Sequence, residues 1–78
     1  MELKNRLALL MNERSITAYR LRVDLKLGKS IVANWLDGKN YPSAEALIRL
    51  ADYFHVSVDY LLGRTNVRET ATDAGEDT

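Results

Sequence analysis

Residues 27–43, "LGKSIVANWLDGKNYPS", hold the features that decide the fold. The segment contains the chain's only tryptophan, Trp35, and its only proline, Pro42. Val32 and Trp35 are spaced as i and i+3, so they share one face of a helix. Gly38 supplies a left-handed residue that ends this helix, and a small basic and polar cluster follows. The sequence therefore predicts a short helix with a buried inner face and an abrupt, basic end.

Apolar residues recur at helical spacing on both sides of this segment. Leu3, Leu7 and Leu10 repeat at i, i+4 and i+7, the pattern of an amphipathic helix. Thr17 and Ser57 precede other apolar patterns and are good N-caps, and no alternation typical of a strand is present. We expect an all-α fold, a five-helix orthogonal bundle with helices over residues 2–13, 18–25, 29–36, 44–54 and 58–62. Its expected core comprises Leu7, Leu21, Val32, Trp35, Leu47, Leu50 and Leu61.

The composition excludes several classes of protein. A length of 78 residues favours one domain with one core. The chain has no cysteine, so a disulfide framework, a thiolate metal site and a thiol nucleophile are excluded, and a reducing compartment fits. No apolar run approaches the ~18 residues that a membrane span needs, and the start lacks the apolar stretch of a signal peptide. We expect a cytoplasmic protein with no membrane association.

The net charge of zero conceals an uneven distribution of charge. Residues 14–40 carry six basic and two acidic side chains, a sum of +4, whereas residues 65–78 sum to −3. Such a local field steers a charged partner even when the whole chain is neutral. Residues 65–78 contain one large apolar residue, Val67, and we expect them to form a disordered acidic tail after a domain over residues 1–64. Removing this tail should leave the melting temperature nearly unchanged.

The predicted order of elements is a helix, a three-residue turn, a second helix that ends at a glycine, and a basic loop. This order is the layout of a helix-turn-helix. In that motif the second helix lies in the DNA major groove and is anchored by apolar residues on its inner face. The opposite face of this helix presents Lys29, Ser30 and Asn34, which are able to hydrogen-bond to base edges or phosphates. Lys39 and the backbone amides of "GKNY" lie beyond the helix end, where the sugar-phosphate backbone is near.

A longer stretch, "SITAYRLRVDLKLGKSIVANWLDGKNYPSAEALIRLADYFHVSVDYLLGRT", resembles the lambda-type repressor and Cro helix-turn-helix family, also called the XRE family. The similarity covers roughly residues 3–64, and its most specific parts are "NWLDGKNYPSAEAL" and "LADYFHVSVDYLLGRT". It implies a lambda repressor-like DNA-binding domain that binds double-stranded DNA sequence-specifically. It also implies a bacterial or phage-encoded transcriptional regulator, most often a repressor, that binds a palindromic operator as a homodimer.

The resemblance implies two groups of DNA-contacting positions. The base-contacting positions are Lys29, Ser30 and Asn34. The positions that contact the sugar-phosphate backbone are Thr17, Ala18, Lys39, Asn40 and Tyr41. At the start of the second helix, Thr17 and Ala18 would offer a hydroxyl and a backbone amide to one phosphate.

The chain departs from the family pattern at several places. Arg22 stands where the family usually has a small alanine packed against the recognition helix, so its stem must reach outward. Lys26 replaces the glycine of the turn and would carry a left-handed strain of about 1 kcal/mol. Gly28 replaces the usual Ser or Thr cap of the recognition helix. Met11 and Leu36 replace an arginine–glutamate pair that links the first and third helices in many relatives.

No residue pattern indicates catalysis, a metal site or a cofactor. His55 has no second histidine or nearby cysteine, and we expect it to end the fourth helix with a positive φ. Phosphate-binding glycine loops and nucleophile elbows are absent from the sequence. The chain is therefore not expected to be an enzyme. The alternative to a DNA-binding protein is a protein-binding helical module that has lost DNA affinity, and a salt-dependent shift of duplex DNA would separate the two.

Overall fold

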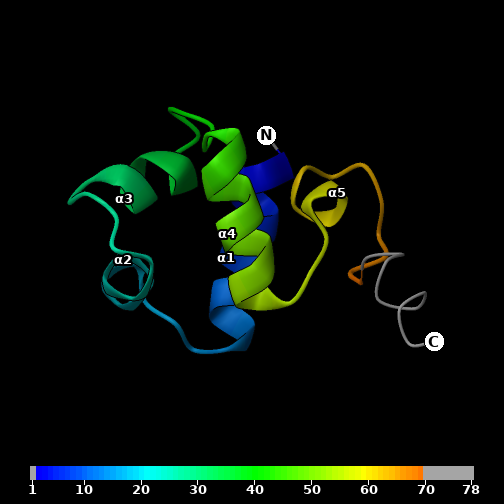
Figure 1. The fold of residues 1–78 in the computed structure, drawn as a ribbon, viewed down its shortest axis with the longest axis horizontal. Coiled ribbons are helices and arrows are strands. Elements are labelled where there is room, and N and C mark those ends of the chain that lie inside the picture. Colours follow the sequence, from blue (N-terminus) through cyan, green and yellow to red (C-terminus); the bar gives the residue numbers. More distant parts are fainter. Residues whose placement is uncertain (1, 70–78) are drawn as a thin grey trace.

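The computed structural model describes residues 2–69, which contain five α-helices and no strand. The helices are α1 (Glu2–Glu13), α2 (Ala18–Leu25), α3 (Ile31–Leu36), α4 (Ala44–Phe54) and α5 (Val58–Leu61). Helices α1 and α4 occupy the centre of the view in Figure 1, with α2 and α3 on one side and α5 on the other. Within this part of the chain no helix is both long and apolar enough to span a bilayer. The predicted all-α, five-helix class is confirmed.

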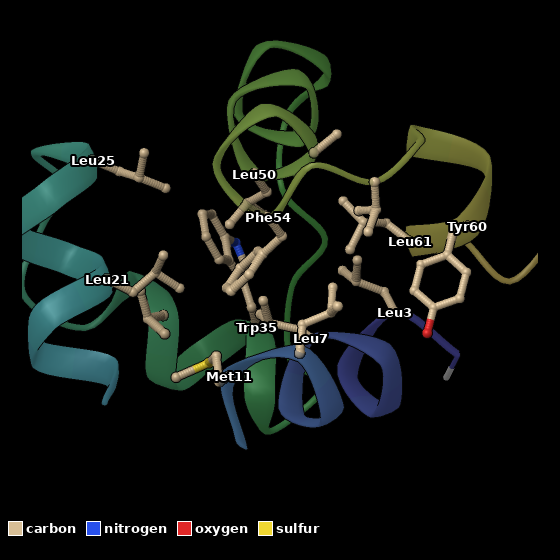
Figure 2. Close-up of a cluster of buried hydrophobic side chains, with 14 residues drawn as sticks. Leu3, Leu7, Met11, Leu21, Leu25, Trp35, Leu50, Phe54, Tyr60 and Leu61 are labelled. Carbon is tan, nitrogen blue, oxygen red and sulfur yellow. The ribbon is translucent and has the colours of Figure 1, made fainter. Parts of the chain in front are cut away.

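One apolar cluster joins all five helices. Figure 2 shows Trp35, Leu50 and Phe54 near its centre, with residues of α1, α2 and α5 around them. Six of the seven expected core residues are buried, and Trp35 is only 5% exposed. Leu47 lies one turn nearer the start of α4 than Leu50 and is only partly buried against the cluster. The buried side of α4 is therefore concentrated in its second half.

All five helices end in the same backbone arrangement, a Schellman-type C-terminus. A left-handed residue follows each helix, and the next amide donates to the carbonyl five positions earlier, as from Ile16 to Met11 at 2.9 Å. The left-handed residues are Ser15, Lys26, Gly38, His55 and Gly63. The predicted positive φ at Lys26, Gly38 and His55 is confirmed, with values of 56°, 78° and 58°. Ser15, at 56°, was not anticipated.

Helix starts are less uniform than helix ends. Thr17, Ser43 and Ser57 each accept a hydrogen bond from the amide three residues later, so α2, α4 and α5 are capped by side chains. Ser30 occupies the same position before α3 but makes no such bond. The first turn there closes through the amide of Ile31 and the carbonyl of Gly28, at 3.4 Å. Regular α-helix therefore begins at residue 31, two residues later than expected, because the first bond from residue i+4 to residue i runs from the amide of Asn34 to the carbonyl of Ser30.

Residues 65–69 form a C-terminal strap that lies beside α5, on the side of the molecule away from α2 and α3 (Figure 1). The carbonyl of Arg68 accepts a hydrogen bond from the amide of Ser57, and its guanidinium binds both carboxylate oxygens of Glu13 at 2.8 Å. The sequence predicted disorder from residue 65, but backbone and charged contacts hold this strap, and a count of apolar residues does not detect them. Residues 70–78 lie outside the described part of the chain.

Candidate nucleic-acid interface

Helices α2 and α3 form a pair that is fixed to the rest of the bundle. Leu21 of α2 is fully buried, and Val32 and Trp35 of α3 are almost fully buried. The guanidinium of Arg49 donates to the carbonyl of Leu25 at the end of α2. These contacts hold the two helices at a fixed angle, which is what a helix-turn-helix requires to present one helix to a groove.

The outer face of α3 lies opposite its buried anchors. Because Val32 and Trp35 point inward, helical periodicity places Ser30 and Asn34 on the far side. Lys29 and Ser30 are exposed and Asn34 is partly buried. The hydroxyl of Ser30 makes no capping bond, so it is free to donate to or accept from a ligand. Three polar side chains of different chemistry therefore lie at the start of α3.

The loop between α3 and α4 carries the expected backbone-contacting residues Lys39, Asn40 and Tyr41, all of them exposed. Only some of the backbone amides in this loop are free to donate to a phosphate. The amide of Lys39 donates to the carbonyl of Asn34 at 2.9 Å, and the amide of Gly38 donates to that of Trp35 at 3.1 Å. The expectation that this loop offers a run of open amides is therefore wrong at these two residues, because the Schellman end of α3 uses them.

Thr17 and Ala18 lie at the start of α2, as expected. The Thr17 hydroxyl oxygen accepts the amide of Arg20 at 3.1 Å, which leaves its proton able to donate to a phosphate. Ala18 lies in the wall of a shallow cleft between α2 and α3, and Lys29 lines the same cleft. The structure thus brings one expected backbone-contacting residue and one expected base-contacting residue together.

The same cleft contains Tyr19 and Arg22, which the sequence did not assign to the interface. One signal was available. The helix-turn-helix pattern usually has a small residue at the position of Arg22. A long cationic side chain at a contact between two helices must extend its charged group out of that contact. The role of Tyr19 depended on where that head group lies, which only the folded structure defines.

The positive charge of residues 14–40 is divided between internal and external uses. Arg14 donates to the carbonyl of Phe54 at 2.7 Å, and Arg20 forms an ion pair with Asp24 at 2.9 Å. The hydrogen bond from Tyr53, together with Arg20, holds the pKa of the Asp24 carboxyl below its usual range. Of the six cations in residues 14–40, four make no ion pair or side-chain hydrogen bond to the described chain: Arg22, Lys26, Lys29 and Lys39. These four are the charges that remain for an external anion.

The fold and this surface define a helix-turn-helix domain, and comparison with known proteins identifies its type. A family model described as a Cro/C1-type HTH DNA-binding domain matches residues 6–66. The chain therefore belongs to the Cro/C1-type helix-turn-helix family of DNA-binding domains.

Two curated relatives are similar to this chain. It is 44% identical over 52 residues to the HTH-type transcriptional regulator AnsR of Bacillus subtilis (strain 168), which covers 67% of this chain and 45% of that protein. It is 31% identical over 62 residues to the HTH-type transcriptional activator BcrR of Enterococcus faecalis, which covers 80% of this chain and 30% of that protein. The similarity thus spans less than half of either relative. No solved structure gave a significant match.

Proposed function

We propose that this protein is a sequence-specific regulator of transcription that binds double-stranded DNA through α2, α3 and the loop after α3. The observation that carries the proposal is the fixed α2–α3 pair, which combines an outward polar face on α3 with nearby cations that have no partner among residues 2–69. Lys29, Ser30 and Asn34 contact bases in the proposed complex. The backbone contacts are assigned to Thr17, Ala18, Lys39, Asn40 and Tyr41.

The chemistry of these side chains supports separate roles in base recognition and in phosphate binding. The amide of Asn34 has the donor–acceptor pair that matches the N6 and N7 edge of adenine, and Lys29 can donate to the acceptors of guanine. Ser30 can donate or accept, so it adapts to either base pair. The Lys39 ammonium, beyond the end of α3, neutralises a phosphate and releases counterions, whatever the sequence. Specificity and affinity therefore reside in different residues.

A single copy of α3, with six residues, contacts only a few base pairs. We infer that two copies bind a palindromic operator as a homodimer, with half-sites about 34 Å apart along one face of the duplex. Repression needs only that the bound protein occupy a promoter, whereas activation needs a further surface for polymerase. We therefore assign the protein to the repressors, in a bacterial or phage-encoded setting and acting in the cytoplasm.

The test begins by selecting preferred sequences from a random duplex pool and then titrating salt on the selected and a scrambled duplex. Asn34→Ala and Lys29→Ala should each lower affinity for the selected duplex by about 1–3 kcal/mol per half-site, with much smaller losses on the scrambled one. Lys39→Ala should weaken both duplexes alike and reduce the salt slope by roughly one per site.

Circular dichroism of each variant provides the control for folding. If wild-type protein shifts neither duplex at low salt, the DNA-binding proposal fails and a protein-binding module takes its place. If all three folded variants bind as the wild type does, DNA binding occurs through another surface.

A further inference from the structure

The cleft between α2 and α3 has a volume of about 230 Å³. Its floor is apolar, since Val32 is 2% exposed, and its mouth is polar. Arg22 and Tyr19 of α2 stand on one wall, and Lys29, just before α3, stands on the other. Two cations, one from α2 and one from the turn before α3, therefore line a single cleft.

Arg22 differs from most arginines of the molecule in having no protein acceptor. Within residues 2–69 no hydrogen bond or ion pair involves its guanidinium, whereas five other arginines donate to carbonyl or carboxylate oxygens. Those five are Arg6, Arg14, Arg20, Arg49 and Arg68. All the guanidinium N–H donors of Arg22 are thus without an acceptor in the described part of the chain, although the residue is half-buried.

The ring of Tyr19 lies beside this guanidinium, with Cζ of Arg22 5.2 Å from the ring centroid. Tyr19 itself is 68% exposed, so the pair is at the surface. A guanidinium that lies against an aromatic face keeps its N–H edge available, and the contact reduces the number of orientations that it samples. The Tyr19 ring therefore preorganises a donor edge that nothing in the described chain uses.

We propose that Arg22, oriented by Tyr19, binds a DNA phosphate and extends the interface from α3 onto the side of α2. This inference rests on the proposed function. A phosphate is favoured over a base edge because the first helix of a helix-turn-helix crosses the sugar-phosphate backbone, whereas base edges are reached from the outer face of the second. A planar guanidinium binds phosphate oxygens through two parallel N–H donors, and Lys29 across the cleft adds a second positive charge.

The test compares Arg22→Ala with Arg20→Ala in salt titrations on selected and scrambled duplexes. Arg20 is on the same helix, carries the same charge and is paired with Asp24, so it controls for the loss of one positive charge. Arg22→Ala should weaken binding to both duplexes roughly fivefold to tenfold per site at ~0.1 M salt and lower the salt slope by about one. Arg20→Ala should change affinity less than twofold.

Two further pairs of variants test the orientation of the guanidinium. Tyr19→Phe keeps the ring and should bind as the wild type does, whereas Tyr19→Ala should lose about twofold to fourfold, as expected from a weak surface cation–π contact. Arg22→Lys keeps the charge but not the paired donors, so it should fall between the wild type and Arg22→Ala. Melting curves establish that each variant is folded.

Three results would overturn the inference. Equal effects of Arg22→Ala and Arg20→Ala, in a protein that binds DNA, would show that Arg22 contributes only general charge. A loss confined to the selected duplex would show that Arg22 contacts a base. If the wild type binds neither duplex, the proposed function fails and this inference fails with it.

Discussion

The two ends of the molecule use the same kind of side chain in opposite ways. Around α1, α5 and the C-terminal strap, Arg6, Arg14 and Arg68 all donate to oxygens of the protein. On the α2–α3 surface, Arg22 and Lys29 have no such partner within residues 2–69. The residue type therefore does not determine the role of a cation in this protein. What determines it is whether an unpaired carbonyl or a carboxylate lies within reach.

Helix C-termini supply three of the four backbone carbonyls that accept hydrogen bonds from arginine side chains within residues 2–69. The last carbonyls of a helix have no intrahelical partner, and a guanidinium from another helix can satisfy them. Arg14 binds the carbonyl of Phe54, the last residue of α4, and Arg49 binds that of Leu25, the last residue of α2. Arg6 reaches Tyr60 of α5 and Thr65 of the strap. These arginines connect elements, and the comparison with the α2–α3 surface leads to four tests.

The largest effect is expected at Arg6, whose side chain is only 14% exposed. Replacing it with methionine removes two hydrogen bonds to backbone carbonyls and a cation–π contact 4.2 Å from the Tyr60 ring centroid. The free energy of unfolding should fall by about 2–4 kcal/mol, measured by urea titration. Arg64→Met, at an exposed arginine without an internal partner in the described chain, should cost under about 0.5 kcal/mol. Similar losses for both variants would contradict the distinction between arginines that have an acceptor in the described chain and those that have none.

Removing the strap should have the next largest effect, which revises the expectation from composition alone that residues 65–78 can be removed without loss of stability. Deletion of residues 65–78 takes away the carbonyl that accepts the amide of buried Ser57 and two acceptors of Arg6, which belong to Thr65 and Asn66. The expected loss is about 1–3 kcal/mol, seen as a melting temperature lower by roughly 5–15 °C. Deletion of residues 70–78 alone retains these three acceptors and should melt within about 2 °C of the whole chain. An unchanged melting temperature in the longer deletion would show that the strap does not stabilise the fold.

A smaller gain in stability is expected at Ser15, which adopts the left-handed conformation with a side chain. Ser15→Gly should raise the free energy of unfolding by about 0.5–1 kcal/mol, because glycine adopts this conformation without strain. Ser15→Ala retains the strain and should give no gain. A stabilising alanine would indicate that the hydroxyl, and not the backbone, limits stability here.

The smallest effects concern two exposed carboxyls. The pKa of Glu13 is lowered by its hydrogen bond with Arg68, and the pKa of Asp24 by its bonds with Tyr53 and Arg20. Since each folded-state pKa lies below the unfolded value, the stabilisation is complete above the ordinary carboxyl range near pH 4 and is lost as pH falls through the lowered values.

Urea titrations across this acidic range give the test. Glu13→Gln should reduce the fall in the free energy of unfolding that arises from the bond between Glu13 and Arg68. Asp24→Asn should reduce the fall that arises from the bonds of Asp24 with Tyr53 and Arg20. If neither variant changes the slope of stability against pH, the two carboxyls do not have lowered pKa values in the folded chain.

Local sequence was sufficient to place most helices. Apolar spacing together with Ser and Thr caps predicted α1, α2 and α4 with the bounds that the structure has, because these signals act within a few residues. The start of α3 was displaced by two residues because the first turn lacks a side-chain cap. Ser15 was missed because a serine gives no sequence signal for the left-handed conformation. The strap was missed because its contacts join residues far apart in the chain.

The candidate site shows the same division. The sequence alone determined the helix-turn-helix pattern and the polar residues at the start of α3, since helical periodicity fixes which side chains oppose the buried Val32 and Trp35. Tertiary structure decided which cations are available. Arg14 and Arg22 are the same residue type, but Arg14 lies within reach of the carbonyl of Phe54 at the end of α4, whereas Arg22 lines the cleft that Lys29 also lines. The assignment depends on distances between separate helices, and those exist only once the core has packed.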